Sequence, residues 1–255
     1  IKINRETLLK PLSSVSSIVE RRHTLPILSN LLLEANSEKM VLTATDLEMQ
    51  ISLSINTAIG GELSTTISAK KLLDICRALP DNTEINMATS DSRVTVKAGK
   101  SKFNLQTLPA VDYPVMTKAV GTDTVSIKIG QSTLKKLFKQ VEFAMAQQDI
   151  RYYLNGMLLV VEGKEVVAVA TDGHRLAFSQ VQLSEAPSGS GQRQEIIIPR
   201  KTILECQHLL EDTDEPLEIS LTANQVKFTF GDIELISKLV EGKFPDFQRV
   251  IPKGH

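Results

Sequence analysis

The sequence A-V-A-T-D-G-H-R, from Ala168 to Arg175, has a counterpart in T-A-T-D-L-E-M, from Thr43 to Met49, and their Thr-Asp pairs lie 126 residues apart. Other stretches recur at intervals of 125 to 131 residues: S-N-L-L-L-E-A with L-N-G-M-L-L-V, A-K-K-L-L-D-I-C with P-R-K-T-I-L-E-C, and L-P-A-V-D-Y-P with V-E-G-K-F-P. The interval grows slowly, as inserted loop residues such as those at 185–193 would cause. This period predicts that one unit of roughly 120–130 residues occurs twice.

Both units show the same order of helix and strand patterns, which predicts an α+β fold. Apolar residues repeat with helical spacing early in each unit; they are Leu8, Leu12, Val15 and Val19 in the first, and Leu134, Leu137, Phe138, Val141 and Met145 in the second. We expect helices over 5–22, 69–79, 131–146 and 199–210, with a kink or a late start at Pro11. Strand patterns include M-L-L-V-V, E-V-V-A-V-A, R-V-T-V-K-A and Q-V-K-F-T-F. Each unit is therefore predicted to pack two helices on about eight antiparallel strands.

The composition indicates a globular chain with aliphatic cores. Hydrophobic residues make up 42% of the 255 positions and aromatic residues 4%, and tryptophan is absent. No apolar run approaches the ~18 residues that a membrane-spanning helix needs, and the first residues contain no apolar signal core. The two cysteines, Cys76 and Cys206, fall in helix patterns far apart in the sequence. We interpret them as buried thiols of a reduced, cytoplasmic protein.

Charge is distributed unevenly between the expected helices and the rest of the chain. The four helical segments hold twelve basic and five acidic residues, although the whole chain has a net charge of −1. One interpretation is that Lys and Arg simply occupy solvated helix faces. The other is that the helices form a basic surface that holds a polyanion such as duplex DNA through its phosphates, without sequence readout.

Two kinds of ligand site are not supported by the spacing of the residues. Gly99-Lys100-Ser101 resembles part of a phosphate-binding loop, but Val94 stands where that motif needs its first glycine, and F-N-L-Q-T-L alternates like a strand. The histidines at positions 23, 174, 208 and 255 show no metal-ligand spacing to one another or to a cysteine. We therefore expect no metal and no cofactor.

The stretch A-T-D-G-H-R-L-A-F, Ala170 to Phe178, combines an acid, a histidine and an arginine and could be read as a catalytic site. Asp172-Gly173 is typical of a two-residue hairpin turn. Because Asp46 occupies the same place in the first unit, we expect Asp172 to accept hydrogen bonds from local backbone N–H groups. Three hypotheses remain: a solvated hairpin, a recognition surface of the second unit, and a hydrolase that uses Asp172, His174 and Ser179. The hydrolase is disfavoured because no nucleophile elbow surrounds Ser179.

Several long motifs resemble the bacterial DNA sliding clamps, the beta subunits of DNA polymerase III. They are T-L-P-I-L-S-N-L-L-L, T-A-T-D-L-E-M, D-I-C-R-A-L-P, Q-D-I-R-Y-Y-L-N-G-M-L, A-T-D-G-H-R-L-A and S-K-L-V-E-G-K-F-P-D-F-Q-R-V-I-P. The resemblance covers essentially the whole chain, in order. It implies repeated DNA-clamp domains, a head-to-tail homodimer ring of the full-length protein with helices lining the hole, and no catalytic site. Such a ring encircles double-stranded DNA and tethers the polymerase as a processivity factor.

The resemblance also implies site residues. Its partner-peptide groove, which takes motifs of the Gln-Leu-x-Leu-Phe type, would use Leu154, Thr171, Gly173, His174, Arg175, Leu176, Pro245, Arg249 and Val250. Its DNA contacts would be Arg22, Lys70, Lys71, Arg77, Gln148, Tyr152, Tyr153, Arg200 and Lys201, with Arg151 less favoured. Its ring interface would include Lys71, Leu79 and Phe103. The implied partners are the replicative polymerase catalytic subunit, the clamp loader, translesion polymerases and repair proteins.

The domain boundaries that follow are 1–122 for the first clamp domain, 123–249 for the second, and 250–255 for the start of a linker. The family has a third domain of similar size, so we expect this chain to be a fragment that closes no normal ring. An alternative, a trimer of two-domain chains, lacks the interface that the third domain supplies. At the groove edge Phe247 and Gln248 depart from the family pattern, where relatives often carry Tyr or Arg.

Overall fold

The computed structural model describes residues 1–20, 24–119, 121, 123–189 and 192–254. The chain divides into two units, which are described separately. The first comprises Ile1–Thr117 together with Asp232–Leu235, and the second comprises Lys118–Gly231 together with Ile236–His255.

The first unit contains two α-helices, α1 and α2, and eight strands, β1 to β8, among its described residues. The helices are α1 (Arg5–Ser16) and α2 (Ala69–Ala78); the strands are β1 (Lys2–Asn4), β2 (Asn30–Ala35), β3 (Lys39–Thr45), β4 (Met49–Asn56), β5 (Leu63–Ser68), β6 (Glu84–Ser90), β7 (Arg93–Ala98) and β8 (Ser101–Leu108), with short 3₁₀ turns η1 (Pro26–Ser29) and η2 (Ala110–Asp112). Neighbouring strands follow the order β1-β6-β7-β8-β5-β2-β3-β4. The β5–β8 register covers only Thr66↔Leu108 and Ile67↔Thr107, so the strands form two sheets that meet at this edge.

The second unit repeats this set with α3, α4 and β9 to β16. The helices are α3 (Gln131–Lys139) and α4 (Arg200–Leu209); the strands are β9 (Val125–Gly130), β10 (Gly156–Glu162), β11 (Glu165–Thr171), β12 (Leu176–Gln182), β13 (Gln194–Pro199), β14 (Pro216–Leu221), β15 (Gln225–Phe230) and β16 (Ile233–Lys238), with 3₁₀ turns η3 (Glu142–Ala144), η4 (Tyr152–Leu154) and η5 (Phe247–Arg249). One sheet has the order β9-β14-β15-β16 and the other β13-β10-β11-β12. Each strand corresponds to the strand eight places earlier in the first unit, which confirms the predicted duplication and α+β class.

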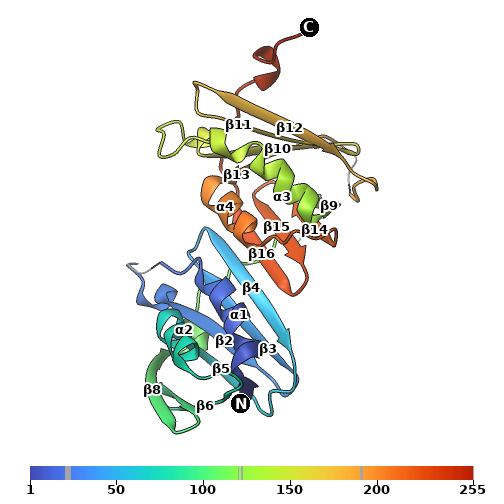
Figure 1. Ribbon diagram of the computed structural model, residues 1–255. Helices are drawn as coiled ribbons and strands as arrows, with labels where there is room; N and C mark the ends of the chain where they lie inside the picture. The colour runs from blue at the N-terminus through green and yellow to red at the C-terminus, as the bar shows by residue number, and fades with distance from the viewer. Residues whose placement is uncertain (21–23, 120, 122, 190–191, 255) are drawn as a thin grey trace. The chain divides into compact units, whose positions relative to one another are not determined.

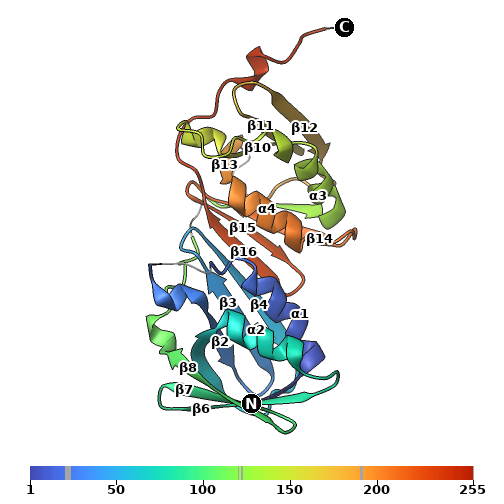
Figure 2. The same cartoon turned by 60° about the vertical axis from the view of Figure 1, so that its left-hand side comes forward.

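In each unit the two helices lie side by side (Figures 1 and 2). Helix α1 packs on β3 and β4, and α2 packs on β2 and β5. Leu8, Leu12 and Val15 form the buried face of α1 as predicted. The helix begins at Arg5 and passes through Pro11, so the alternative of a late start was wrong. The side-chain oxygen of Asn4 accepts a hydrogen bond from the Glu6 N–H and caps this start.

Two expected helices are shorter than predicted. Helix α1 ends at Ser16, and Ile18 rather than Val19 is the buried residue that follows it. Helix α3 ends at Lys139, and the chain then forms the 3₁₀ turn η3. Val141 and Met145 are buried as expected, but they lie outside the helix. The helical spacing of apolar residues continued past the helix end because the following turns bury side chains in the same core.

Gly99 lies in a turn with φ of 58°, and F-N-L-Q-T-L belongs to β8, as its alternation predicted. Cys76 and Cys206 are buried free thiols on α2 and α4.

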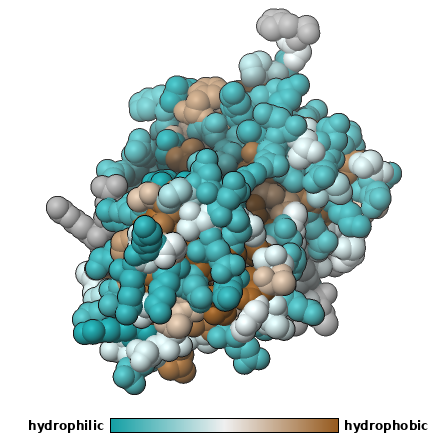
Figure 3. All heavy atoms as spheres, turned by 60° about the horizontal axis from the view of Figure 1, so that its bottom comes forward, coloured by the Kyte–Doolittle hydropathy of each residue, from teal (hydrophilic) through white to brown (hydrophobic). Residues whose placement is uncertain are grey.

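Along the described parts of the chain, no helix combines the length and apolar character needed to cross a membrane. The face seen in Figure 3 is mostly hydrophilic, with hydrophobic side chains in small separate patches.

Candidate functional site

The loop from Asp172 to Arg175, here called the corner, joins β11 to β12 and is held by hydrogen bonds from two side chains. One carboxylate oxygen of Asp172 accepts from the backbone N–H groups of His174 at 2.9 Å and Arg175 at 3.0 Å. The Thr171 hydroxyl donates to the Arg175 carbonyl at 2.6 Å and accepts from the Gly173 N–H at 3.1 Å. The two bonds to Asp172 confirm its expected capping role. They also lower the pKa of its carboxyl, with the His174 N–H as the largest cause.

The prediction of a two-residue turn at Asp172-Gly173 was wrong. Thr171 pairs with Leu176 across the ladder, so four residues form the loop. The Asp172 carboxylate supplies the reason, because it pairs N–H groups that would otherwise continue the ladder. Gly173 adopts a φ of 90°, a backbone region in which a side chain is strained.

The corner orients Arg175 away from the strand. Its Nε donates to the second Asp172 oxygen at 3.2 Å, and a terminal nitrogen donates to the Phe143 carbonyl at 2.8 Å. Its guanidinium also lies over the Phe143 ring, 5.4 Å from the centroid. His174 and Arg175 are both exposed. The corner therefore presents two exposed polar side chains, of which Arg175 is held by contacts with Asp172 and Phe143.

An apolar cluster, here called the sheet–tail cluster, lies next to the corner in the same unit. Its buried members are Leu158, Val160, Val167, Val169, Ile197, Phe244 and Phe247. The first five come from one face of β10, β11 and β13, because cross-strand partners share a face. The two phenylalanines come from the chain segment 239–251, here called the tail. Partly buried Tyr153, Leu176, Val240 and Ile251 border this cluster, so apolar surface remains accessible at its edge.

The tail carries the other residues expected in the groove. Pro245, Arg249 and Val250 are exposed there, and the Arg249 guanidinium pairs with Asp246 at 2.9 Å. Phe247 is buried, and its ring centroid lies 6.0 Å from that of Phe178 on β12. This contact places the tail against the sheet next to the corner. Leu154 is buried at the end of η4. The corner residues and Leu176 thus share one region with the tail.

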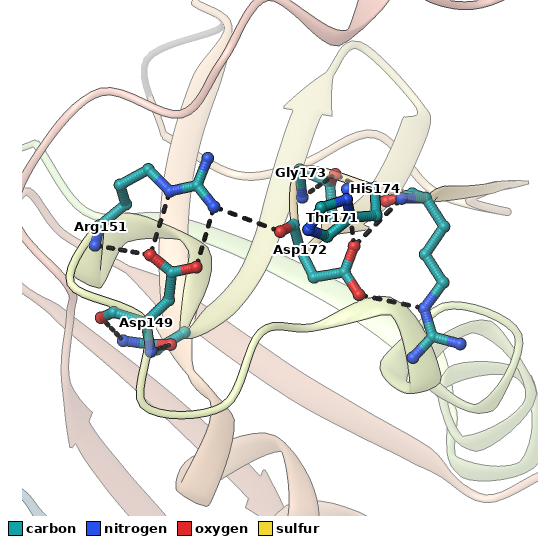
Figure 4. Close-up of polar contacts among 8 residues, drawn as sticks. Asp149, Arg151, Thr171, Asp172, Gly173 and His174 are labelled. Atoms are coloured by element: carbon teal, nitrogen blue, oxygen red, sulfur yellow. Dashed lines mark hydrogen bonds and ion pairs between the residues drawn. The ribbon is translucent and has the colours of Figure 1, made fainter.

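Beside the corner, Asp149 and Arg151 form a tight ion pair (Figure 4). The Arg151 Nε donates to one carboxylate oxygen at 3.0 Å, a terminal nitrogen donates to the other at 2.9 Å, and the Arg151 backbone N–H adds a bond of 2.8 Å. The Arg151 side-chain hydrogen bonds lower the pKa of Asp149 to about 2, and the same pairing raises the pKa of Arg151.

The geometry gives the hydrolase hypothesis no support. The Asp172 carboxylate is occupied by backbone N–H groups and by Arg175, so it does not orient a histidine base. The Ser179 hydroxyl donates to the side-chain oxygen of Gln140 at 2.6 Å rather than to His174. Among the described residues, no group of three or more His, Cys, Asp or Glu is arranged to hold a metal ion.

Comparison with known proteins agrees with this fold. The family model for the N-terminal domain of the DNA polymerase III beta subunit matches residues 1–117, and the model for its central domain matches residues 128–246. The chain is 46% identical over 255 residues to the beta sliding clamp of Pseudomonas aeruginosa and 43% identical over 254 residues to that of Escherichia coli K12. The chain belongs to the bacterial beta sliding clamps.

The alignments to both relatives cover 99% of this chain and 68% of each relative. The crystal structure of the Pseudomonas aeruginosa beta subunit superposes with a TM-score of 0.93 at 44% identity, over 100% of this chain and 68% of that one. A Caulobacter crescentus beta subunit gives 0.90 at 39% identity, over 99% and 69%. A further Pseudomonas aeruginosa sliding clamp, bound to griselimycin, gives 0.92 at 44% identity, over 100% and 68%.

The residues expected to contact DNA in this sliding-clamp chain lie on helices and on one loop. Lys70, Lys71 and Arg77 are exposed on α2, and Lys70 also pairs with Asp74 at 2.8 Å. Arg200 and Lys201 begin α4. Gln148, Tyr152 and Tyr153 lie in the loop between η3 and β10, where the two tyrosine rings stand edge to face at 6.0 Å. Arg22 lies outside the described residues.

The residues expected at the ring interface lie in two elements of the first unit. Lys71 is exposed on α2, and Phe103 is partly exposed on β8. Leu79 follows α2 and is 8% exposed, so most of its surface is already buried within the unit.

Sequence reasoning missed the residues that support the corner from outside its motif. Phe143 supplies both a carbonyl and a ring to Arg175, and Asp149 fixes Arg151. Phe247 had been placed at the groove edge, whereas Phe244 was missed although an aromatic three residues before Phe247 stands out in a chain with 4% aromatic residues. Phe143 had no such signal, since its contact with Arg175 spans 32 residues of sequence.

Proposed function

We propose that this chain works as a DNA sliding clamp whose second unit captures short partner peptides at the corner and the adjoining edge of the sheet–tail cluster. The docking site is proposed because two features lie next to each other. One is accessible apolar surface at Tyr153, Leu176 and Ile251. The other is a pair of polar side chains, His174 and Arg175, on a loop fixed by Asp172. An apolar surface with a few ordered polar groups suits a peptide of the Gln-Leu-x-Leu-Phe type.

Fluorescence anisotropy of a labelled Gln-Leu-x-Leu-Phe peptide, titrated with this chain, tests the docking function. We expect saturable binding that the double variant His174→Ala/Arg175→Ala weakens about tenfold or more, as loss of anchoring side chains does at small interfaces. Glu48→Ala is the matched control, because Glu48 occupies the place of His174 in the corresponding loop of the first unit. Equal binding by the double variant and the unaltered chain would contradict the assignment.

We also propose that both helix pairs face duplex DNA and hold its phosphates. Exposed Lys71 and Arg77 on α2 and exposed Lys201 on α4 support this, because bases on helices contact phosphates without reading sequence. Each lost phosphate contact should make the slope of log affinity against log salt concentration shallower by roughly 0.9. The double variant Lys71→Ala/Arg77→Ala should therefore have a slope shallower by about 2. Lys97→Ala on β7 serves as control and should leave the slope unchanged. Equal slopes for the double variant would count against this surface.

The proposed partners are the replicative polymerase catalytic subunit, the clamp loader, translesion polymerases and repair proteins, each bringing a short motif to the same docking site in the cytoplasm. The chain performs no catalysis in this scheme. Its contribution is to keep the polymerase at a high effective concentration near DNA, within the head-to-tail ring of the full-length protein. Competition between unlabelled motif peptides for the labelled probe tests the shared site. Simultaneous saturable binding of two peptides would contradict it.

A further inference from the structure

Arg151 contacts the corner without belonging to the residues proposed to dock peptides. An ideal Cβ placed on Gly173 would lie 3.0 Å from both terminal nitrogens of the Arg151 guanidinium. The guanidinium therefore occupies the space that a side chain at position 173 would fill. One of these nitrogens also donates to the Asp172 carbonyl at 3.4 Å, a long hydrogen bond that joins it to the corner backbone (Figure 4).

Asp149 determines the direction in which the Arg151 guanidinium points. Its two carboxylate oxygens take the Nε and a terminal nitrogen in the paired geometry that fixes the plane of a guanidinium. Arg151 is therefore not an exposed cation on a freely rotating stem. Asp149 therefore sets the orientation of the guanidinium toward Gly173.

Asp149 is itself held by a reciprocal pair of hydrogen bonds with Asn155. The Asp149 N–H donates to the Asn155 side-chain oxygen and the Asn155 amide donates to the Asp149 carbonyl, each at 2.9 Å. The Asn155 carbonyl in turn accepts the backbone N–H of Arg200, the first residue of α4, at 3.0 Å. A continuous chain of contacts thus runs from the start of α4 through Asn155, Asp149 and Arg151 to the corner.

We propose that Arg151 is a positioning residue for the docking corner: oriented by Asp149, its guanidinium braces Gly173 and Asp172 and so fixes where His174 and Arg175 stand. This inference rests on the proposed docking function. Because Arg151 lies in the segment that also carries Gln148, Tyr152 and Tyr153, its contacts join the corner to the loop expected to contact DNA.

Backbone amide resonances of the 255-residue chain test the brace without any ligand. Arg151→Ala, Arg151→Lys and Asp149→Asn should each move the ¹H–¹⁵N resonances of Gly173, His174 and Arg175. Lysine keeps the charge but lacks the planar fork, so it should not restore the resonances. Arg193→Ala is the matched control, because Arg193 bridges Glu162 and Glu195 at the far end of the same sheet and should leave the corner resonances in place.

Peptide anisotropy with the same variants separates a brace from a direct peptide contact. A positioning role predicts that Arg151→Ala and Asp149→Asn weaken Gln-Leu-x-Leu-Phe binding by similar factors, about three- to tenfold, and that the double variant is no worse than Arg151→Ala alone. Loss of affinity in Arg151→Ala with normal affinity in Asp149→Asn and unmoved corner resonances would show that Arg151 touches the peptide itself, and would overturn the brace.

Unchanged corner resonances together with unchanged peptide affinity in Arg151→Ala and Asp149→Asn would also overturn the positioning role of Arg151. Failure of the unaltered chain to bind the peptide is a different result, since it overturns the docking function and the brace's part in docking. The resonance shifts then still decide whether Arg151 holds the corner. The two failures are therefore distinguishable.

Discussion

Asp46 and Asp172 make the same hydrogen bonds in the two units of the chain. The Asp46 carboxylate accepts the N–H groups of Glu48 at 2.9 Å and Met49 at 2.8 Å, as Asp172 accepts those of His174 at 2.9 Å and Arg175 at 3.0 Å. The hydroxyls of Thr45 and Thr171 match as well, donating to Met49 at 2.7 Å and to Arg175 at 2.6 Å. One loop geometry therefore occurs twice, with different side chains displayed on it.

Replacing either aspartate by alanine should destabilise its own unit. Asp46 is buried, so Asp46→Ala leaves N–H groups unpaired out of water and should cost about 1–3 kcal/mol. Asp172→Ala should lower stability less, because water reaches its loop, yet it should weaken peptide binding, which Asp46→Ala should not. Urea unfolding and peptide anisotropy of the two variants check this. Peptide binding that depends equally on both aspartates would contradict it.

Gly173→Ala should cost more stability than Gly163→Ala. Both glycines have positive φ, 90° and 55°, so each substitution should carry a conformational cost of about 1–3 kcal/mol. At Gly163 the new methyl meets nothing within 4 Å, whereas at Gly173 it meets the Arg151 guanidinium at 3.0 Å. Thermal unfolding of both variants, each also made in an Arg151→Ala background, measures the difference. The excess cost at position 173 should become smaller when Arg151 is removed, and the part that remains reflects the less favourable φ of 90°.

Acid should weaken the second unit through Asp149. Its folded-state pKa, lowered to about 2 chiefly by the Arg151 side chain, lies below the ordinary value near 3.9 for an unfolded chain. Between these values the unfolded state binds the proton and the folded state does not, so the contribution is present above about pH 4 and is lost as pH falls toward 2. Urea midpoints from pH 5 to pH 2.5 should fall less steeply in Asp149→Asn. Parallel curves would contradict this.

Neither cysteine should react in the folded chain. Burial raises the pKa of the Cys76 thiol to about 11 and raises that of Cys206 further, so little thiolate forms at pH 8 and reagents cannot reach it. A chromogenic disulfide reagent should titrate no thiol in native buffer within minutes and both thiols in guanidinium chloride. Rapid reaction of one thiol in native buffer would show that its helix opens locally.

The duplication, the strand count and the helix starts were predictable because they depend on local patterns. Asn4 caps α1 and Ser68 caps α2, and polar residues at helix starts are visible in sequence. The end of α3 was not predictable from spacing, since Val141 and Met145 keep the apolar pattern while the backbone leaves the helix. Packing in the shared core decided that boundary.

The candidate site was predictable where a motif repeats and not where it depends on distant residues. Asp172 could be assigned a structural role because Asp46 stands in the same place without a histidine beside it. The four-residue loop was missed, because Asp-Gly alone favours a two-residue turn and the competing carboxylate bonds outweigh that preference. Phe143 was not predictable, because its contact with Arg175 joins residues that lie 32 positions apart in the sequence.

Leu47 stands where Gly173 stands, and it too has a positive φ, 77°. The first unit therefore keeps a backbone shape that its own side chain disfavours. The two loops share one backbone geometry, and only the second displays the histidine and arginine that we propose for peptide docking. The first unit, which lacks His and Arg at this loop, is therefore an internal negative control for peptide binding by the second unit. Replacing residues 47–49 with Gly-His-Arg would test whether the shared loop geometry is enough to give the first unit peptide binding.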